Sequence, residues 1–352
     1  MEKVRIGIVG SKFAADFHCD SYSRNEKAEV VAVAAIDNLP QISSKWHIPS
    51  TYEDYNEMLR RDDIQLVSVC VPNFLHHRVV LAAAKAGKNV VCEKPLGITV
   101  AEAREMVEAC RAAGVKLFYA EDWVFAPALR RVIEVVKEGG VGDVLYVKAK
   151  ETHNGTHSVF AKNAKTCGGG CLIHLGIHPI GWVLHFLGAE GRNRVAEVFG
   201  STNAGGADNF VHKDNTGEDW ACGLIKFANG QRALVEGNYI TVGGMDDKIE
   251  IYGSQGVIKV DLTFGSPVSV YSRPGYSYTI EKADNTLGWT RPAVDEFYNL
   301  GYVHELRYAV ECVLKDEQPT YGVSGALGLR CTQVLEAMYQ SSREGRVVRG
   351  PW

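Results

Sequence analysis

The regular alternation of apolar runs and helix-like segments over the first 120 residues constrains the fold more than any other feature. The runs that read as buried strands are Val4–Val9, Ala28–Ile36, Leu66–Val71, Asn89–Cys92 and Lys116–Ala120. The segments that read as helices are Phe13–Tyr22, Tyr52–Arg61, His76–Ala86 and Val100–Ala113. Near-continuous apolar strands between helices are typical of a parallel sheet covered on both faces. We therefore predict a doubly wound α/β domain over residues 1–124.

The pattern changes after residue 124, where a connecting helix is expected at Ala126–Lys137. Short runs follow in which apolar and polar residues alternate, with turn signals such as Asn229-Gly230 between them. The runs are Val144–Lys150, Ala196–Ser201, Trp220–Phe227, Arg232–Ile240, Lys248–Tyr252, Val257–Leu262, Val268–Ser272 and Tyr278–Glu281. They predict an antiparallel sheet, and helices return at Phe297–Val313 and Ala326–Arg343. Residues 125–352 are thus expected to form a second, α+β domain.

The composition is that of a globular protein and argues against several classes. Of the 352 residues, 46% are hydrophobic and 23% are charged, and a chain of this length holds about two domains. The formal charge of −4, without a basic stripe, argues against nucleic-acid binding. We find no apolar run of about eighteen residues that would predict a membrane span, and no pattern of a secretion signal. The nine scattered cysteines form no C-x-x-C pair and are expected to be reduced and mostly buried, as in a cytoplasmic protein.

A glycine-containing turn joins the first expected strand to the first expected helix. It reads Gly7-Ile8-Val9-Gly10-Ser11-Lys12-Phe13-Ala14, which is G-x-x-G-x-x-x-A instead of the usual G-x-G-x-x-G. A tight turn at a helix N-terminus suits a pyrophosphate. The residues expected to contact a dinucleotide here are Gly7, Gly10, Ser11, Lys12 and Phe13.

An acidic residue, Asp37, ends the second expected strand. A carboxylate at this place can bind the ribose hydroxyls of the adenosine and repels a 2'-phosphate, which favours NAD over NADP. The alternative is that Asp37 only caps a helix or solvates a loop. Lys12 is a cation in the neighbouring turn and could favour a phosphate, so NADP stays open.

Three further blocks are more specific. They are Val71-Pro72-Asn73-Phe74-Leu75-His76, the Glu93-Lys94-Pro95 segment within residues 86–96, and Gly168-Gly169-Gly170-Cys171-Leu172-Ile173-His174-Leu175-Gly176-Ile177-His178. Together they resemble the glucose-fructose oxidoreductase / inositol dehydrogenase / MocA (Gfo/Idh/MocA) family over essentially the whole chain. The resemblance implies a Rossmann domain followed by an α/β domain whose open antiparallel sheet forms an oligomer interface, with the C-terminal helices packing back near the first domain. It also implies oxidation or reduction of a secondary alcohol on a sugar or cyclitol with NAD(H) or NADP(H).

The resemblance also assigns roles to residues. Lys94 matches the lysine that contacts both the substrate and the nicotinamide ribose, and Glu93 matches the acidic residue on the ribose side. His178 matches the histidine usually assigned as acid/base. The residues that match the stretch lining the cofactor are Pro72, Asn73 and His76. The main departure is His174, because the family normally has aspartate four residues before the histidine.

The residue chemistry agrees with these roles. His178 fits a base because imidazole titrates near neutrality, and Lys94 fits a positive group that stabilises a developing oxyanion. The alternatives are a surface lysine before a proline and a hydrogen-bonded core histidine. On one helix His174 would share a face with His178. It could be a second acid/base or substrate ligand, could mark a repurposed or weakly active site, or could bind a metal with His178.

Five of the eleven histidines fall between residues 153 and 185. They are His153, His157, His174, His178 and His185. We expect His153, His157, His174 and His178 to contact the substrate. Three imidazoles, those of His153, His174 and His178, would also suit zinc or a similar ion, although H-L-G-I-H lacks the glutamate of a metalloprotease motif. Without a metal, these histidines would hydrogen-bond sugar hydroxyls or an acidic group.

Aromatic residues supply the remaining candidates. Trp123 is expected to close over the nicotinamide or the substrate, and ordinary packing between domains is its alternative role. Tyr302 and His304 are further candidates for the same pocket.

The leading hypothesis is an NAD-dependent sugar or polyol dehydrogenase, or the corresponding reductase, that works as a homo-oligomer, a dimer or a tetramer. Its partner would be a small-molecule substrate. A second hypothesis is a lyase or glycosidase that keeps NAD tightly bound and oxidises its substrate only transiently. A third is a sugar or cofactor sensor on an inactive scaffold, which the retained Lys94 disfavours.

Overall fold

The computed structural model describes residues 3–188, 190–263, 268, 270–275, 286–290, 295–350 and 352. The chain divides into two compact units. The first comprises Met1–Ala126 and Gly301–Thr332, and the second comprises Pro127–Leu300 and Gln333–Trp352. The first boundary lies two residues beyond the expected one, but the residues after 125 do not form one continuous domain, because Gly301–Thr332 return to the first unit.

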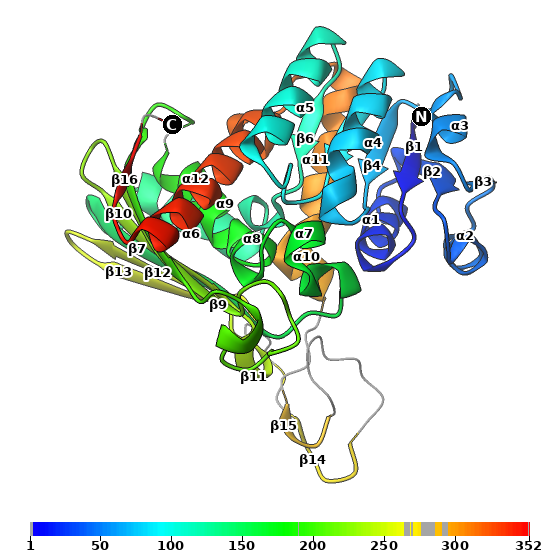
Figure 1. Ribbon diagram of the computed structural model, residues 1–352. Helices are drawn as coiled ribbons and strands as arrows, with labels where there is room; N and C mark the ends of the chain where they lie inside the picture. Colours follow the sequence, from blue (N-terminus) through cyan, green and yellow to red (C-terminus); the bar gives the residue numbers. More distant parts are fainter. Residues whose placement is uncertain are drawn as a thin grey trace. The chain divides into compact units, whose positions relative to one another are not determined.

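A six-stranded parallel sheet forms the centre of the first unit, in the order β3-β2-β1-β4-β5-β6 (Figure 1). The strands are β1 Val4–Val9, β2 Ala28–Ala34, β3 Thr51–Tyr52, β4 Leu66–Val69, β5 Asn89–Cys92 and β6 Leu117–Tyr119. This order is that of the doubly wound dinucleotide-binding fold, so the predicted fold class is confirmed. The short β3 was not predicted, because two residues carry no readable periodicity.

Helices complete the first unit. They are α1 Phe13–Ser23, α2 Leu39–Trp46, α3 Tyr55–Leu59, α4 Asn73–Lys85, α5 Val100–Ala112, the 3-10 turns η1 Asp122–Val124 and η4 Tyr321–Val323, α11 Tyr302–Lys315 and the first turns of α12 Gly325–Glu344. Helix α4 packs beside α5, and α11 packs on α1. The apolar side of α11, with Leu306, Ala309 and Val310, joins the core formed by Ile6 and Ile8 of β1. This packing explains why a segment so late in the sequence belongs to the first unit.

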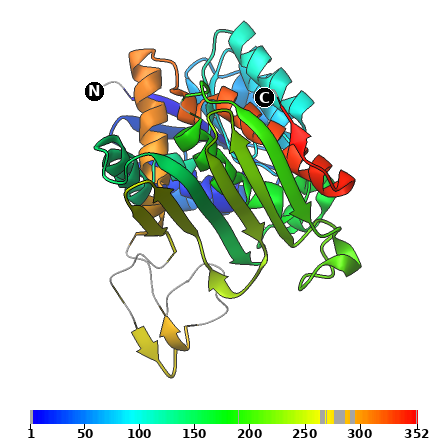
Figure 2. The same ribbon diagram turned by 90° about the vertical axis from the view of Figure 1, so that its left-hand side faces the viewer.

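An eight-stranded sheet dominates the second unit, in the order β13-β12-β7-β10-β9-β8-β16 with β11 paired to β7. The strands are β7 Val144–Asn154, β8 Val195–Thr202, β9 Trp220–Phe227, β10 Arg232–Asn238, β11 Ile240–Met245, β12 Lys248–Gly253, β13 Val257–Asp261 and β16 Val348–Arg349. Figure 2 shows them side by side. The predicted antiparallel pairing holds except between β7 and β10, which run parallel. A separate hairpin pairs β14 Val270–Ser272 with β15 Gly288–Thr290, and the strand expected at residues 278–281 lies outside the described residues.

One face of this sheet is buried beneath helices. The helical segments of the unit are α6 Pro127–Lys137, η2 Val159–Lys162, α7 Ala164–Cys167, α8 Cys171–His174, α9 Ile177–Leu187, η3 Gly206–Asp208, α10 Glu296–Leu300 and the rest of α12. Helices α8 and α9 both contact β10. They approach closely because β10 carries Gly237, where a Cβ atom would lie 2.6 Å from the backbone nitrogen of Gly176. This close contact fixes the junction between α8 and α9.

That junction corrects one expectation. His174 is the last residue of α8 and His178 is the second residue of α9. The chain direction turns by 52° between residues 164–174 and residues 177–187. The two histidines therefore do not share a face of one helix, although they are four residues apart.

Two further expectations were that the cysteines are reduced and mostly buried and that no segment spans a membrane. All nine cysteines are free thiols, and every one except Cys222 is buried. Among the described residues, no single helix is long and apolar enough to cross a bilayer. One bent pair of helical segments, residues 164–174 with residues 177–187, has the length and the apolar composition of a membrane span, and nothing beyond length and composition indicates one.

Candidate functional site

The turn after β1 has the geometry of a phosphate-binding turn. Gly10 has φ +127°, and a Cβ atom there would lie 2.1 Å from the carbonyl oxygen of Cys70, so only glycine fits. Ser11 follows, and its hydroxyl donates to the Asp37 carbonyl oxygen at 2.8 Å. Lys12 is the N-cap of α1 and makes no side-chain hydrogen bond to the first-turn amides. The N-cap side chain therefore does not compete for those amides, and a helix N-terminus of this kind suits an anion.

The other predicted residues of this turn lie around it. Gly7 is in β1, and a Cβ atom there would lie 2.9 Å from the methyl carbon of Met58, so its role is packing within the unit. Phe13, the first residue of α1, is half exposed. Asp37 follows the end of β2 and pairs with Lys12 at 3.0 Å. The hydrogen bond from Lys12 lowers the pKa of Asp37 below its usual value, so this carboxylate is ionised at neutral pH.

His76 braces the two segments that carry the family motifs. Pro72 is the N-cap of α4, and Asn73 and His76 are buried on that helix. The ring of His76 has Nδ1 at 2.7 Å from the Pro95 carbonyl oxygen and Nε2 at 2.9 Å from the Val71 carbonyl oxygen. Burial lowers the pKa of His76, while the contacts with the Pro95 and Val71 carbonyl oxygens oppose this shift. His76 therefore fixes the segment after β5 against the end of β4.

Glu93 is held from two sides. Its Oε1 lies 3.0 Å from Nε2 of His18, a fully buried residue of α1. Its Oε2 accepts the backbone N–H of Lys94 at 3.2 Å. The sequence reasoning assigned Glu93 to the ribose side of the cofactor and missed His18. The signal for His18 was a polar residue among the apolar positions of the first helix.

A second buried acidic residue, Asp122, was not predicted from the sequence. Asp122, in η1 after β6, is buried beside Trp123, and Trp123 is buried too. Burial raises the pKa of Asp122 to about 8, although the positive charge of Lys94 opposes the shift and Glu93 adds to it. Burial likewise raises the pKa of Glu305 on α11. The first unit thus keeps two protonatable carboxyl groups that interact with each other, and one of them, Asp122, also interacts with the charge of Lys94.

This shift predicts a pH-dependent stability. For an aspartate whose folded pKa is about 8 instead of roughly 3.9, the free energy of unfolding is highest below the unfolded pKa and falls progressively until the pH passes the folded pKa. Asp122→Asn should therefore show a smaller fall in Tm between pH 5 and pH 9 than the wild type. Differential scanning calorimetry measures this, with Asp62→Asn, an exposed residue, as control. Equal pH slopes for wild type and Asp122→Asn would contradict the assignment.

In the second unit, Glu151 of β7 lies between two histidines. Its Oε1 is 3.3 Å from Nε2 of His153, and its Oε2 is 3.9 Å from Nε2 of His178. Glu151, His153 and His178 are all buried. Residues two apart on a strand point to the same face, so β7 directs both Glu151 and His153 to one side. Glu151 is the residue that the sequence reasoning missed, because the expected strand stopped at Lys150.

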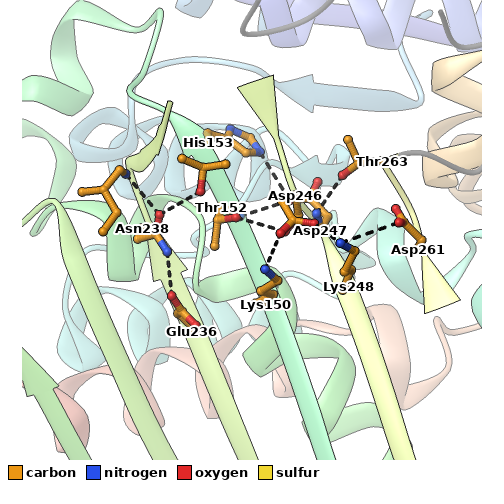
Figure 3. Close-up of polar contacts among 12 residues, drawn as sticks. Lys150, Thr152, His153, Glu236, Asn238, Asp246, Asp247, Lys248, Asp261 and Thr263 are labelled. Carbon is orange, nitrogen blue, oxygen red and sulfur yellow. Dashed lines mark hydrogen bonds and ion pairs between the residues drawn. The ribbon is translucent and has the colours of Figure 1, made fainter. Parts of the chain in front are cut away.

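A polar network beside this cluster joins β7 to the residues just before β12 and just after β13, as Figure 3 shows. Asp247 is buried and has Oδ1 at 3.9 Å from Nε2 of His153. The same oxygen accepts the backbone N–H of Thr152 at 3.1 Å. The Asp247 N–H donates to the hydroxyl of Thr263 at 2.7 Å. These bonds fix the carboxylate that faces His153.

His174 has a different partner. Its Nδ1 lies 2.6 Å from the hydroxyl of Tyr239, a buried residue directly after β10. Burial raises the pKa of Tyr239, so the hydroxyl stays protonated and can donate to Nδ1. The ring of His174 also meets the ring of Phe160 edge-on. When the Tyr239 hydroxyl is the donor, a neutral His174 carries its proton on Nε2, the ring nitrogen that does not contact Tyr239.

The remaining predicted residues are dispersed. His157 is exposed in the loop after β7. Tyr302 and His304 lie on α11, and Tyr302 packs against Phe17 of α1. Among the described residues of the second unit, no three ligand atoms from His, Cys, Asp or Glu come within 4.8 Å of one another. His153, His174 and His178 thus do not converge on one point there, and the metal site remains a prediction that the structure does not support.

Comparison with known families covers most of the chain. Residues 4–121 match a model described as oxidoreductase family, NAD-binding Rossmann fold. Residues 133–349 match a model described as oxidoreductase family, C-terminal alpha/beta domain. The family resemblance expected from the motifs is thereby confirmed, together with the two-part fold.

Individual relatives are similar over most of their length. The chain is 26% identical to a D-apiose dehydrogenase of Paraburkholderia graminis, over 99% of this chain and 90% of the relative. It is 26% identical to a myo-inositol 2-dehydrogenase of Thermotoga maritima, over 98% of both chains. A solved structure described as GenD2 from gentamicin A biosynthesis in complex with NAD superposes with a TM-score of 0.91 at 26% identity, covering 99% of this chain and 97% of the other.

Proposed function

The chain belongs to the Gfo/Idh/MocA oxidoreductase family and carries its NAD-binding Rossmann domain, and from this premise we propose that it oxidises a secondary alcohol of a sugar, cyclitol or related polyol, or reduces the matching ketone. The observation that carries the proposal is that both family domains are matched while Lys94 stands in its motif. Two full-length relatives are named as dehydrogenases of polyhydroxylated substrates, apiose and myo-inositol. Their substrates define the class to test.

The first unit has the groups that NAD requires. The uncapped amides at the start of α1 suit the pyrophosphate, and the ionised Asp37 suits the adenosine ribose. Gly10 keeps the turn tight. When bound, NAD would accept a hydride from the carbinol carbon, and the protein has to manage the proton and the charge that remain.

We assign the positive charge to Lys94. A lysine ammonium beside the substrate oxygen stabilises the alkoxide character that develops as the C–H bond breaks. Its backbone is fixed by the bond from its N–H to Glu93, which His18 holds in turn. This support keeps the start of the lysine side chain in a defined place.

We assign the proton to His178, with Glu151 as its carboxylate partner. An imidazole that takes the alcohol proton becomes a cation, and a carboxylate nearby stabilises that cation. The family's usual aspartate is replaced by His174, which is tied to Tyr239. Glu151 offers the carboxylate from β7 instead, at 3.9 Å. His174, with its Nε2 proton, is suited to hydrogen-bond a substrate hydroxyl.

The proposal is tested by turnover with purified full-length protein. NAD+ and NADP+ are offered with a panel of sugars, cyclitols and sugar acids, with and without chelator, and absorbance at 340 nm is followed. We expect chelator-insensitive NADH formation on at least one polyol. Cofactor that stays bound through purification without net NADH formation would favour the redox-assisted lyase or glycosidase. Sugar binding without any turnover would favour a sensor.

We also propose that the exposed face of the eight-stranded sheet pairs with a second copy of the chain. Side chains alternate along the strands, so that Val198 and Ile225 are buried whereas Phe199 and Leu224 are exposed. Phe199 and Leu224 are register partners on β8 and β9, and Leu234 of β10 continues the row. An apolar row across an open sheet is typical of a protein interface.

Leu224→Glu is therefore expected to convert a dimer or tetramer into a smaller species, because it buries a charge in the interface. Light scattering after size-exclusion chromatography measures the mass. Val242→Glu is the control, since Val242 is an exposed apolar residue on β11, outside the main path of the sheet. A monomeric wild type, or a Leu224→Glu variant with unchanged mass, would contradict the proposal.

A further inference from the structure

One carboxylate links the turn after β1 to the segment after β2. Ser11 Oγ lies 3.1 Å from Asp37 Oδ1, and Lys12 Nζ lies 3.0 Å from Asp37 Oδ2. The side-chain amide of Asn38 donates to the Ser11 carbonyl oxygen at 2.8 Å, so the segment after β2 also donates a hydrogen bond to the turn. Both oxygens of Asp37 thus have a donor on the turn.

Lys12 occupies a position in this turn that is usually glycine. In Gly10-Ser11-Lys12 it stands where a G-x-G-x-x-G turn has its second glycine. Such a turn has an acidic residue after the second strand that accepts the 2'-hydroxyl of NAD, whereas NADP requires a cation near its 2'-phosphate. This chain has both groups in contact, an acid in Asp37 and a cation in Lys12.

The ammonium is free to move. The side chain of Lys12 is 68% exposed and that of Asp37 is 55% exposed. An ion pair as exposed as this contributes little to stability, and the four-carbon stem of lysine is flexible. Lys12 can therefore leave Asp37 for a competing anion without disturbing the sheet or α1.

We propose that Lys12 enables the adenosine end of this site to accept a 2'-phosphate, so that the chain uses NADP as well as NAD. This inference rests on the proposed function and extends it to the choice of cofactor. With NAD, Lys12 stays on Asp37, and the carboxylate still accepts the ribose hydroxyls because it has about four acceptor positions. With NADP, the ammonium turns to the phosphate in a charge-assisted contact and offsets the repulsion from Asp37.

Binding of NAD+ and NADP+ to the full-length protein tests this without a known substrate. Isothermal titration calorimetry gives both Kd values for the wild type, Lys12→Ala and Lys12→Arg. Lys27→Ala is the matched control, because it removes the same charge from an exposed residue just before β2, at the end of that strand away from Asp37. We expect the two wild-type Kd values to lie within about tenfold of each other. Losing one charge-assisted contact should then raise the Kd for NADP+ about tenfold in Lys12→Ala.

The outcomes separate the two proposals. The Kd for NAD+ should change by less than about threefold in Lys12→Ala, Lys12→Arg should keep NADP+ binding, and Lys27→Ala should match the wild type. A wild type that binds NAD+ alone, or a Lys12→Ala variant that weakens both cofactors equally, overturns the role of Lys12 and leaves the proposed function intact. Failure to bind either cofactor overturns both.

Discussion

Replacing Lys94 by alanine is expected to lower kcat/KM by about 10²–10³-fold, because a charged donor to the developing oxyanion contributes on this scale. The fold should survive, since Lys94 is only partly buried and substitutions outside the core usually change stability little. Initial rates of NADH formation on the best substrate of the panel give kcat/KM, and calorimetry gives Tm. Lys85→Ala, at the exposed end of α4, controls for loss of a charge in the same unit.

A conservative substitution of Lys94 separates the role of its charge from a role in the fold. Lys94→Arg should retain part of the activity, because the charge remains while its geometry changes. Full activity in Lys94→Ala, with the control also active, would remove Lys94 from the mechanism. Loss of activity together with a large fall in Tm would instead assign it a structural role.

Removing the carboxylate behind His178 is expected to reduce turnover with little effect on substrate affinity. Glu151→Gln should lower kcat by about 10–10²-fold and change KM less than about threefold, because its charge stabilises the protonated imidazole formed during the reaction. His178→Asn should cost about 10²–10⁴-fold, the usual range for a general base. Steady-state kinetics with saturating cofactor separates kcat from KM.

Two further variants make this test specific. Glu151→Asp retains the charge and should recover part of the lost kcat. Glu236→Gln, on the neighbouring strand β10, removes a carboxylate whose Oε1 accepts a hydrogen bond from the side-chain amide of Asn238 at 2.6 Å, and it should behave as wild type. Equal kcat for Glu151→Gln and wild type would show that His178 works without this carboxylate. A rise in KM alone would place Glu151 in substrate binding.

The architecture of the first unit could be predicted because each of its long strands and most of its helices can be recognised from their own residues. Continuous apolar runs identify buried parallel strands at any position, and five of the six strands were found in this way. Helix α2 was missed because only Ile42 of its eight residues is buried, so the apolar stripe is too narrow to recognise. The parallel pairing of β7 with β10 was missed because pairing between distant strands leaves no mark in either strand's own sequence.

In the candidate site, residues in local motifs were also predicted, whereas contacts that depend on distant segments were not. Lys94, His178 and Asp37 were found because they lie in motifs or at strand ends. The break between His174 and His178 was not foreseen, since it depends on Gly237 of a strand sixty residues later. Glu151 was missed although Glu151 and His153 are two apart, because β7 continues to Asn154, beyond the expected end. The contact of Lys12 with Asp37 required the folded turn to bring two known candidates together.

The central claim is that the carbinol hydrogen moves directly to the nicotinamide ring of NAD. The most direct measurement uses the best substrate of the panel with deuterium on the reacting carbon and identifies by mass spectrometry where the deuterium goes. We predict one deuterium in the released NADH, together with a slower reaction than for the unlabelled substrate. Product that forms while its deuterium stays in the substrate carbon or passes to water, with none in NADH, would contradict a dehydrogenase.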